Sequence, residues 1–346
     1  MTKNNLSQTL SRLTPCLALL AAPLSFPAQA LEVEGYGSLR IGVEFVDPDN
    51  QPGNFDSYTA LRDAYSRVGV KATHKLNQDW TLMGQLELPL DLVNLEIQSP
   101  YDDNDNMRIG KLQVNGPLGT LWYGRGWMAY YNYIAYPVDY FSSYYSGWAT
   151  LTTFRREDTL YYATPRIQGV QAAFASTQDN GSLPDRRNQY VLSYARDGLN
   201  LALGRDDQGS GGYAINGISA SYSAGPWYIA GKYEELDTTG SNDGRSAKNL
   251  LVQYALDSKN TLRGMIADVD AWSYGDNIYH LGWDHQYRDD LKFFAEYYSE
   301  QTTAAISDQR QSSFLGSASF NAPADSGGSA LFLGLRYDFS GKLGSQ

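Results

Sequence analysis

The stretch Val33-Glu34-Gly35-Tyr36-Gly37-Ser38-Leu39-Arg40-Ile41-Gly42-Val43-Glu44-Phe45 decides the fold class. Apolar side chains and glycines occupy its odd positions, and polar side chains occupy most of its even positions. Because successive side chains of a β-strand point to opposite faces, this pattern predicts a strand with one apolar and one polar face. The same alternation returns in Trp80–Asp91, Leu291–Tyr298 and Leu331–Phe339.

Two kinds of connection separate these runs. Seven are short clusters rich in Gly, Pro, Asn and Asp, the residues that tight turns favour. Eight are longer and polar, and they alternate with the short ones, so fifteen connections join about sixteen strands. Short turns on one side and long loops on the other are typical of an outer-membrane barrel. The sequence therefore predicts an all-β fold, a single transmembrane antiparallel β-barrel whose closure leaves no unpaired edge in hydrocarbon.

A soluble β-sandwich with the apolar face inside is the alternative. Aromatic residues near the strand ends favour the barrel, because Trp and Tyr form girdles at membrane interfaces. The candidate girdle residues are Trp80, Trp122, Trp227, Trp283, Tyr190, Tyr254, Tyr297 and Tyr337.

The first thirty residues predict export. Lys3 and Arg12 give a positive n-region, Leu17–Leu24 is apolar but too short to span a bilayer, and Ala28-Gln29-Ala30 matches a small-residue cleavage site. We expect residues 1–30 to be a cleaved signal peptide and residues 31–339 to form the barrel. The alternation of the last run stops after Phe339, so we expect residues 340–346 to form a tail outside it.

Composition excludes several classes of protein. The chain has 346 residues, 13% aromatic residues and a net charge of −11, which argue against disorder and against a nucleic-acid partner. The three histidines have no zinc spacing, and neither a GxSxG elbow nor a catalytic set is found. We therefore expect no catalytic residues, no metal and no cofactor, and a protein that is not an enzyme.

Five short motifs carry a family resemblance. They are Glu34-Gly35-Tyr36-Gly37, Tyr65-Ser66-Arg67-Val68-Gly69-Val70-Lys71, Asn106-Met107-Arg108-Ile109-Gly110, Gly119-Thr120-Leu121-Trp122-Tyr123-Gly124-Arg125, and Asp158-Thr159-Leu160-Tyr161-Tyr162-Ala163-Thr164-Pro165 followed by Gly169. In this order the chain resembles the general diffusion porins of Gram-negative outer membranes over nearly all of residues 32–339.

This resemblance implies a fold and a function. It implies a sixteen-stranded barrel whose third loop folds into the lumen, usually in a homotrimer, located in the outer membrane among lipid and lipopolysaccharide. The implied function is a water-filled channel for passive diffusion of ions and small hydrophilic solutes. A saccharide-preferring porin is the alternative within this class. A barrel enzyme and a non-conducting adhesin are alternatives outside it.

The resemblance also implies the site residues. Arg67, Arg108 and Arg155 match basic positions of the constriction wall, with Arg156 one residue away as the alternative to Arg155. Arg40 lies on the polar face of the first strand and adds a fourth charge. Asp139 is the only acid between Trp127 and Arg155, which makes it the candidate loop carboxylate. A wall richer in charge than the loop is expected to favour anions. Arg125 faces either the lumen or the trimer contact.

The candidate inward loop is unusually aromatic. Its aromatic residues are Trp127, Tyr130, Tyr131, Tyr133, Tyr136, Tyr140, Phe141, Tyr144, Tyr145 and Trp148. Two interpretations stay open: the rings pack the loop against the barrel wall, or some of them, with Tyr131 and Tyr136 as candidates, line the pore and stack on sugar rings.

Overall fold

The computed structural model describes residues 31–49, 57–99, 106–177, 186–209, 212–270, 277–301, 305–306, 308–313, 316–321 and 327–343. The expected signal peptide, residues 1–30, lies outside them. Within these ranges, no helix is both long enough and apolar enough to cross a bilayer.

Nearly all regular structure in this part of the chain is β. The strands of the main sheet are β1 (Glu32–Pro48), β2 (Tyr58–Asp63), β3 (Ser66–Lys75), β4 (Thr81–Leu90), β5 (Ile109–Gly116), β6 (Gly119–Trp127), β7 (Arg155–Ala163), β8 (Val170–Thr177), β9 (Arg187–Arg196), β10 (Leu199–Asp207), β11 (Tyr213–Ala224), β12 (Trp227–Thr238), β13 (Ser246–Ala255), β14 (Asn260–Val269), β15 (Ile278–Arg288), β16 (Leu291–Glu300) and β19 (Gly328–Leu343). β17 (Asp308–Ser313) and β18 (Gly316–Asn321) form a separate hairpin.

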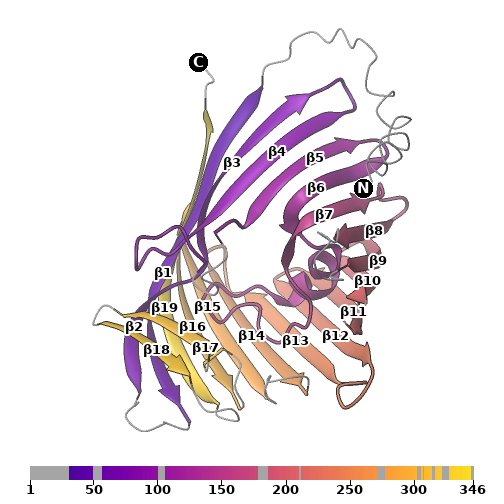
Figure 1. Cartoon of the computed structure of the whole chain (residues 1–346). Helices are drawn as coiled ribbons and strands as arrows, with labels where there is room; N and C mark the ends of the chain where they lie inside the picture. The colour runs from indigo at the N-terminus through magenta and orange to yellow at the C-terminus, as the bar shows by residue number, and fades with distance from the viewer. Residues whose placement is uncertain are drawn as a thin grey trace, which may run out of the picture.

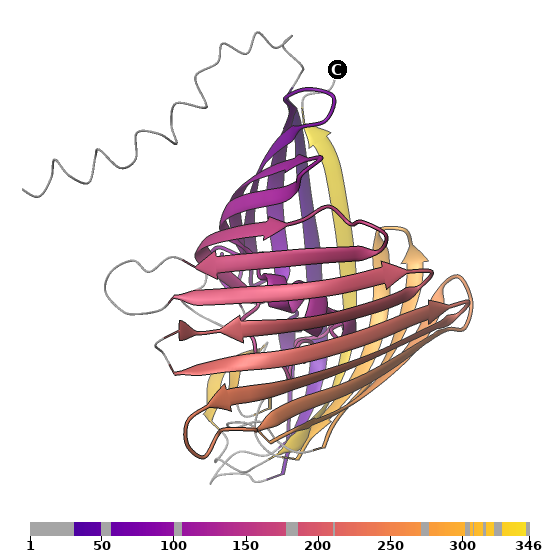
Figure 2. The same cartoon turned by 90° about the vertical axis from the view of Figure 1, so that its right-hand side faces the viewer.

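The main sheet closes on itself (Figures 1 and 2). Each strand is antiparallel to its neighbours, and β1 pairs with β19 from Val33 opposite Leu343 to Pro48 opposite Gly328. β2 and β3 pair with successive halves of β1, so these two strands share one position in the wall and the 17-stranded sheet is a barrel of 16 positions. The predicted architecture is confirmed.

The break between β2 and β3 is a sharp bend at Ala64 and Tyr65. Tyr65 has a φ of 65°, in the left-handed region that non-glycine residues rarely adopt. Hydrogen bonds hold the bend: the Ala64 nitrogen donates to the Arg40 carbonyl at 3.0 Å, and the Ser66 nitrogen donates to the Asp63 carboxylate at 2.8 Å. The bend sets the position of Arg67 on the inner wall.

The last strand is longer than the sequence pattern predicts. β19 continues past Phe339 to Leu343, and Ser340 pairs with Tyr36, Gly341 with Gly35 and Lys342 with Glu34. The predicted boundary between barrel and tail at residues 339 and 340 is therefore wrong. Backbone pairing does not need alternating apolar side chains, so it persists where the alternation has stopped.

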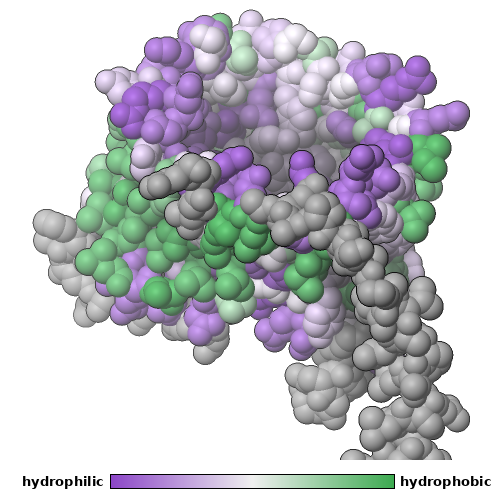
Figure 3. All heavy atoms as spheres, turned by 90° about the horizontal axis from the view of Figure 1, so that it is seen from above, coloured by the Kyte–Doolittle hydropathy of each residue, from purple (hydrophilic) through white to green (hydrophobic). Residues whose placement is uncertain are grey.

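The outer face carries the apolar side chains. Leu112, Leu203, Ile218 and Leu281 are each more than half exposed. Figure 3 shows hydrophobic side chains on the outside of the wall and hydrophilic ones around the hollow. Of the candidate girdle residues, Tyr190, Trp227, Trp283 and Tyr297 are exposed on the outside. The prediction that Trp122 belongs to a girdle is wrong. Trp122 is buried inside the barrel, where it stacks on Tyr161 with ring centroids 5.0 Å apart.

Candidate functional site

The segment between β6 and β7, residues 128–154, folds inside the barrel (Figure 1). We call it the inward loop. It contains two short helical turns, η2 (Tyr131–Ala135) and η3 (Tyr136–Val138). Most of its residues between Met128 and Leu151 are buried, which means that the loop lies against the wall.

Carbonyl and carboxylate oxygens of wall side chains accept hydrogen bonds from the backbone of the inward loop. Glu296 on β16 accepts from the nitrogens of Ser142 and Ser143, at 2.7 and 2.9 Å. Glu234 on β12 accepts from the Leu151 nitrogen at 3.0 Å, and the Gln189 side chain accepts from the Tyr130 nitrogen at 2.8 Å. Buried N–H groups without partners are costly, so these contacts fix the course of an otherwise irregular segment.

Donors on the wall bind the loop carbonyls in turn. The Lys232 ammonium donates to the Ala149 carbonyl at 2.8 Å, and the Arg263 guanidinium donates to the Tyr140 carbonyl at 2.7 Å. Lys232 is itself paired with Glu234, and Arg263 with Asp284, both at 2.6 Å. Each of these buried cations therefore has a carboxylate partner, as low-dielectric surroundings require.

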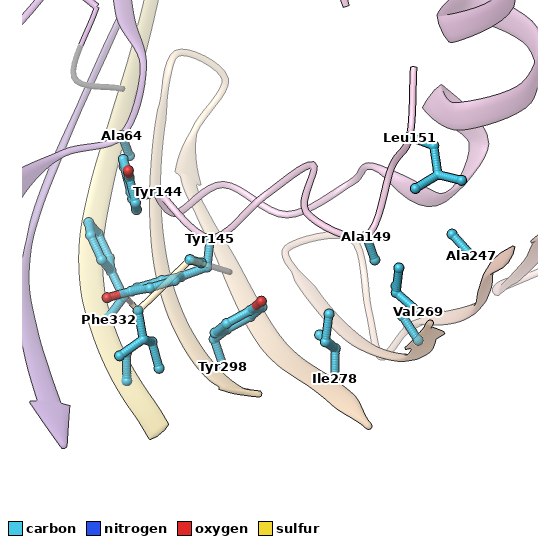
Figure 4. Close-up of a cluster of buried hydrophobic side chains, with 14 of the residues drawn as sticks. Ala64, Tyr144, Tyr145, Ala149, Leu151, Ala247, Val269, Ile278, Tyr298 and Phe332 are labelled. Atoms are coloured by element: carbon cyan, nitrogen blue, oxygen red, sulfur yellow. The ribbon is translucent and has the colours of Figure 1, made fainter. Parts of the chain in front are cut away.

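Loop aromatics add an apolar contact with the wall (Figure 4). Tyr145 stacks on Tyr298 at 4.9 Å between ring centroids, and Tyr144 stacks on Tyr65 at 5.6 Å. The Tyr145 hydroxyl donates to Glu44 at 3.0 Å. For these residues, the interpretation that the rings pack the loop against the barrel is the one the structure supports.

The predicted site residues meet at one cavity of about 830 Å³ between the inward loop and the opposite wall. Arg40, Arg67, Arg108 and Arg155 line it, and so do Asp139, Tyr131 and Tyr136. Arg156 is not among the described lining residues, so Arg155 is the better match of the two. Arg125 also lines the cavity, so of its two expected positions it takes the one that faces the lumen.

One arginine of the cavity was not identified from the sequence. Arg336 on β19 lines the same cavity and lies directly opposite Arg40 in the β1–β19 register. Its position on the polar face of the run Leu331–Phe339 could have indicated that Arg336 points into the lumen. That run alone does not reveal which residue of β1 lies opposite Arg336.

The carboxylates that pair with these arginines were not identified from the sequence either. Arg108 pairs with Glu87 at 2.9 Å, while Arg67 lies 4.0 Å from the same carboxylate. Arg336 pairs with Asp338 at 2.7 Å. The side chains of Arg67 and Arg336 remain 21% and 28% exposed, whereas Arg108 is buried. Arg67 and Arg336 are therefore better placed than Arg108 to contact a solute.

The loop side of the cavity is mainly aromatic and hydroxylic. The two oxygens of Asp139 accept hydrogen bonds from Tyr131 and Ser146, both at 2.5 Å. Burial raises the pKa of Tyr131, and the neighbouring Asp139 charge raises it further. The Arg155 guanidinium lies 4.6 Å from the Trp127 ring centroid, a cation–π distance. The Asp139 carboxylate is thus hydrogen-bonded within the loop.

The architecture and this cavity define a membrane-spanning channel narrowed by its own loop. A family model described as Gram-negative porin matches residues 16–341, and the chain belongs to this family. It is a porin of the outer membrane, where it forms a channel for passive diffusion of solutes.

Solved structures agree with this fold. An anion-selective porin from Comamonas acidovorans has a TM-score of 0.72 at 17% identity, covering 90% of this chain and 100% of that one. Salmonella typhi OmpF in complex with daunomycin has 0.66 at 17% identity, covering 89% and 97%. The trimer form of Vibrio cholerae OmpT has 0.63 at 16% identity, covering 90% and 100%. A search of curated proteins gave no match.

Proposed function

We propose that the cavity between the inward loop and the arginine wall is the constriction of the channel and that it favours anions. The observation that carries this proposal is the composition of the lining, in which six arginines accompany one carboxylate, Asp139, among the described residues. Charged rings at a narrow aqueous passage decide which ions cross easily.

The paired carboxylates reduce this excess of charge without removing it. Glu87, Asp338 and Glu157 pair with Arg108, Arg336 and Arg125. With Asp139, four carboxylates face six arginines, which leaves two positive charges. Acids at the mouth of the channel act weakly on the constriction, because charges are screened over about 8 Å at physiological salt. The name of the Comamonas acidovorans porin, whose fold is similar, is in keeping with this preference.

The zero-current potential across a planar bilayer in a potassium chloride gradient tests the proposal. The wild-type protein is expected to show an anion-selective potential, and Arg67→Gln/Arg336→Gln is expected to shift it toward cations. Arg205→Gln, an exposed arginine paired with Asp237 and outside the cavity lining, is the matched control. An unchanged potential in the double variant would contradict the assignment of these arginines to the constriction.

The saccharide-preferring alternative has less support. Tyr130, Tyr144 and Tyr145 are buried against the wall and offer no face to a sugar, whereas Tyr136, one of the two candidate stacking residues, is 48% exposed. Current block by added neutral sugars would support that alternative.

We further propose a homotrimer surrounded by lipid and lipopolysaccharide, without enzymatic activity. Mass measurement in mild detergent tests the trimer, and the trimer form of Vibrio cholerae OmpT supports it.

A further inference from the structure

The two sides of the constriction differ in chemistry. The wall side carries Arg40, Arg67, Arg108 and Arg336, from β1, β3, the segment before β5, and β19. The loop side is formed largely by aromatic rings, namely Trp127, Tyr131, Tyr136, Tyr140 and Phe141. A solute in this cavity therefore has cations on one side and ring faces and edges on the other.

Tyr136 is the most open of these loop rings. It is 48% exposed, whereas Tyr131 is buried. Its ring contacts two other rings of the loop: the Tyr140 centroid lies 5.4 Å away and the Tyr131 centroid 6.3 Å away, both tilted. The Tyr228 hydroxyl donates to the carbonyl of the next residue, Pro137, at 2.8 Å. Tyr136 is thus an exposed aromatic surface on a fixed backbone.

Arg336 lines the same cavity as Tyr136. Burial raises the pKa of Tyr136, as do the neighbours Tyr140 and Asp139, while the positive charge of Arg336 opposes this rise. Both residues line the same cavity, Arg336 from the β19 wall and Tyr136 from the inward loop. The partly exposed Arg67 lines the same wall.

We propose that this constriction preferentially binds and passes aromatic carboxylates, with the carboxylate toward Arg67 and Arg336 and the ring against Tyr136. Guanidinium groups match carboxylates in geometry, and aromatic rings pair favourably in tilted or offset arrangements. A neutral sugar would not balance the positive charge of the arginines, and an inorganic anion would leave the rings unused. This inference rests on the proposed anion preference and makes it specific for one class of solute.

The test compares three solutes on the purified protein in a planar bilayer. Benzoate has both charge and ring, cyclohexanecarboxylate has the charge and a similar size without the aromatic ring, and benzyl alcohol has the ring without the charge. The readout is the concentration that reduces the potassium chloride current by half. For the wild type we expect benzoate to act at a concentration about two- to tenfold lower than cyclohexanecarboxylate, the range that one aromatic pair provides. Benzyl alcohol is expected to be weakest.

Variants assign the effect to the ring. Tyr136→Leu is expected to make the two carboxylates equal, while Tyr136→Phe keeps the difference. Tyr222→Leu, at an outward-facing tyrosine that is 50% exposed, is the control and should behave as the wild type. Equal block of the wild type by the two carboxylates would overturn the inference even if Tyr136→Leu failed to fold. An unchanged difference in folded Tyr136→Leu would also overturn it.

One further measurement separates the anion preference from the preference for aromatic carboxylates. The zero-current potential in potassium chloride is recorded on the same membranes. A cation-selective wild type would refute the proposed function, whereas an anion-selective channel that does not distinguish benzoate from cyclohexanecarboxylate would refute only the aromatic-carboxylate inference.

Discussion

Glu296 accepts a hydrogen bond of 2.7 Å from the backbone nitrogen of Ser142, which is 154 residues away in the sequence. The same carboxylate binds the Ser143 nitrogen at 2.9 Å and lies 3.1 Å from His280 Nε2. One buried side chain on β16 thus holds the middle of the inward loop. The position of the arginine–aromatic cavity depends on such anchors, because the loop is one of its two sides.

Removing this anchor is expected to loosen the loop. Glu296→Ala leaves two buried N–H groups without their acceptor, at about 1–3 kcal/mol each. We expect larger open-channel current noise and a lower temperature of unfolding in detergent. Glu96→Ala, at an exposed loop residue, is the control. Noise equal to that of the wild type would show that the loop does not need Glu296.

A side chain in place of Gly42 on β1 is expected to destabilise the barrel. A Cβ at Gly42 would lie 2.3 Å from Phe332 Cε1 and 2.5 Å from the Leu333 carbonyl oxygen, and the second contact is to backbone. Gly42→Ala should therefore destabilise the barrel by about 1–3 kcal/mol. Gly84→Ala is the matched control, because nothing lies within 4 Å of its Cβ. The readout is the temperature at which the folded band disappears on a gel. Equal temperatures for the two variants would contradict the close packing at Gly42.

Truncation separates the end of β19 from the residues beyond it. Deleting residues 344–346 should leave the barrel's thermal stability unchanged. Deleting 340–346 removes four residues paired with β1, from Ser340 opposite Tyr36 to Leu343 opposite Val33, and should lower the unfolding temperature. Heating samples before electrophoresis measures both. If the longer deletion were as stable as the full chain, the pairing beyond Phe339 would contribute nothing.

The sequence predicted what depends on local patterns. Alternating side chains and turn residues reveal strands and their connections, because a barrel in lipid repeats the same two-faced element at every position. Arg67 and Arg108 could be proposed as wall residues because they lie in two of the motifs that resemble the porin family. The aromatic character of the inward loop was also visible.

Long-range pairing could not be predicted. The bend at Tyr65, the Glu296–Ser142 contact and the meeting of Arg336 with Arg40 all depend on register between distant segments. Glu87 illustrates the consequence for the site. Its position on the polar face of β4 could be seen in the sequence, but its pairing with Arg108 depends on how β4 and the segment before β5 align. The sequence therefore did not reveal how much of the wall's positive charge is paired.

The pairing of Arg108 with Glu87 at 2.9 Å predicts a compensating pair of variants. Arg108→Gln removes a positive charge and leaves the buried Glu87 with one ion-pair partner among the described residues, Arg67 at 4.0 Å. We expect it to shift the zero-current potential toward cations and to lower stability by about 3–5 kcal/mol, the cost of breaking a buried pair. Arg108→Gln/Glu87→Gln leaves the net charge of the wall unchanged, so both its potential and its stability should return toward the wild type. The potential is read in a planar bilayer and stability from denaturant unfolding in detergent. If the double variant were as cation-shifted as Arg108→Gln alone, Arg108 would act on passing ions directly rather than as half of a neutral pair.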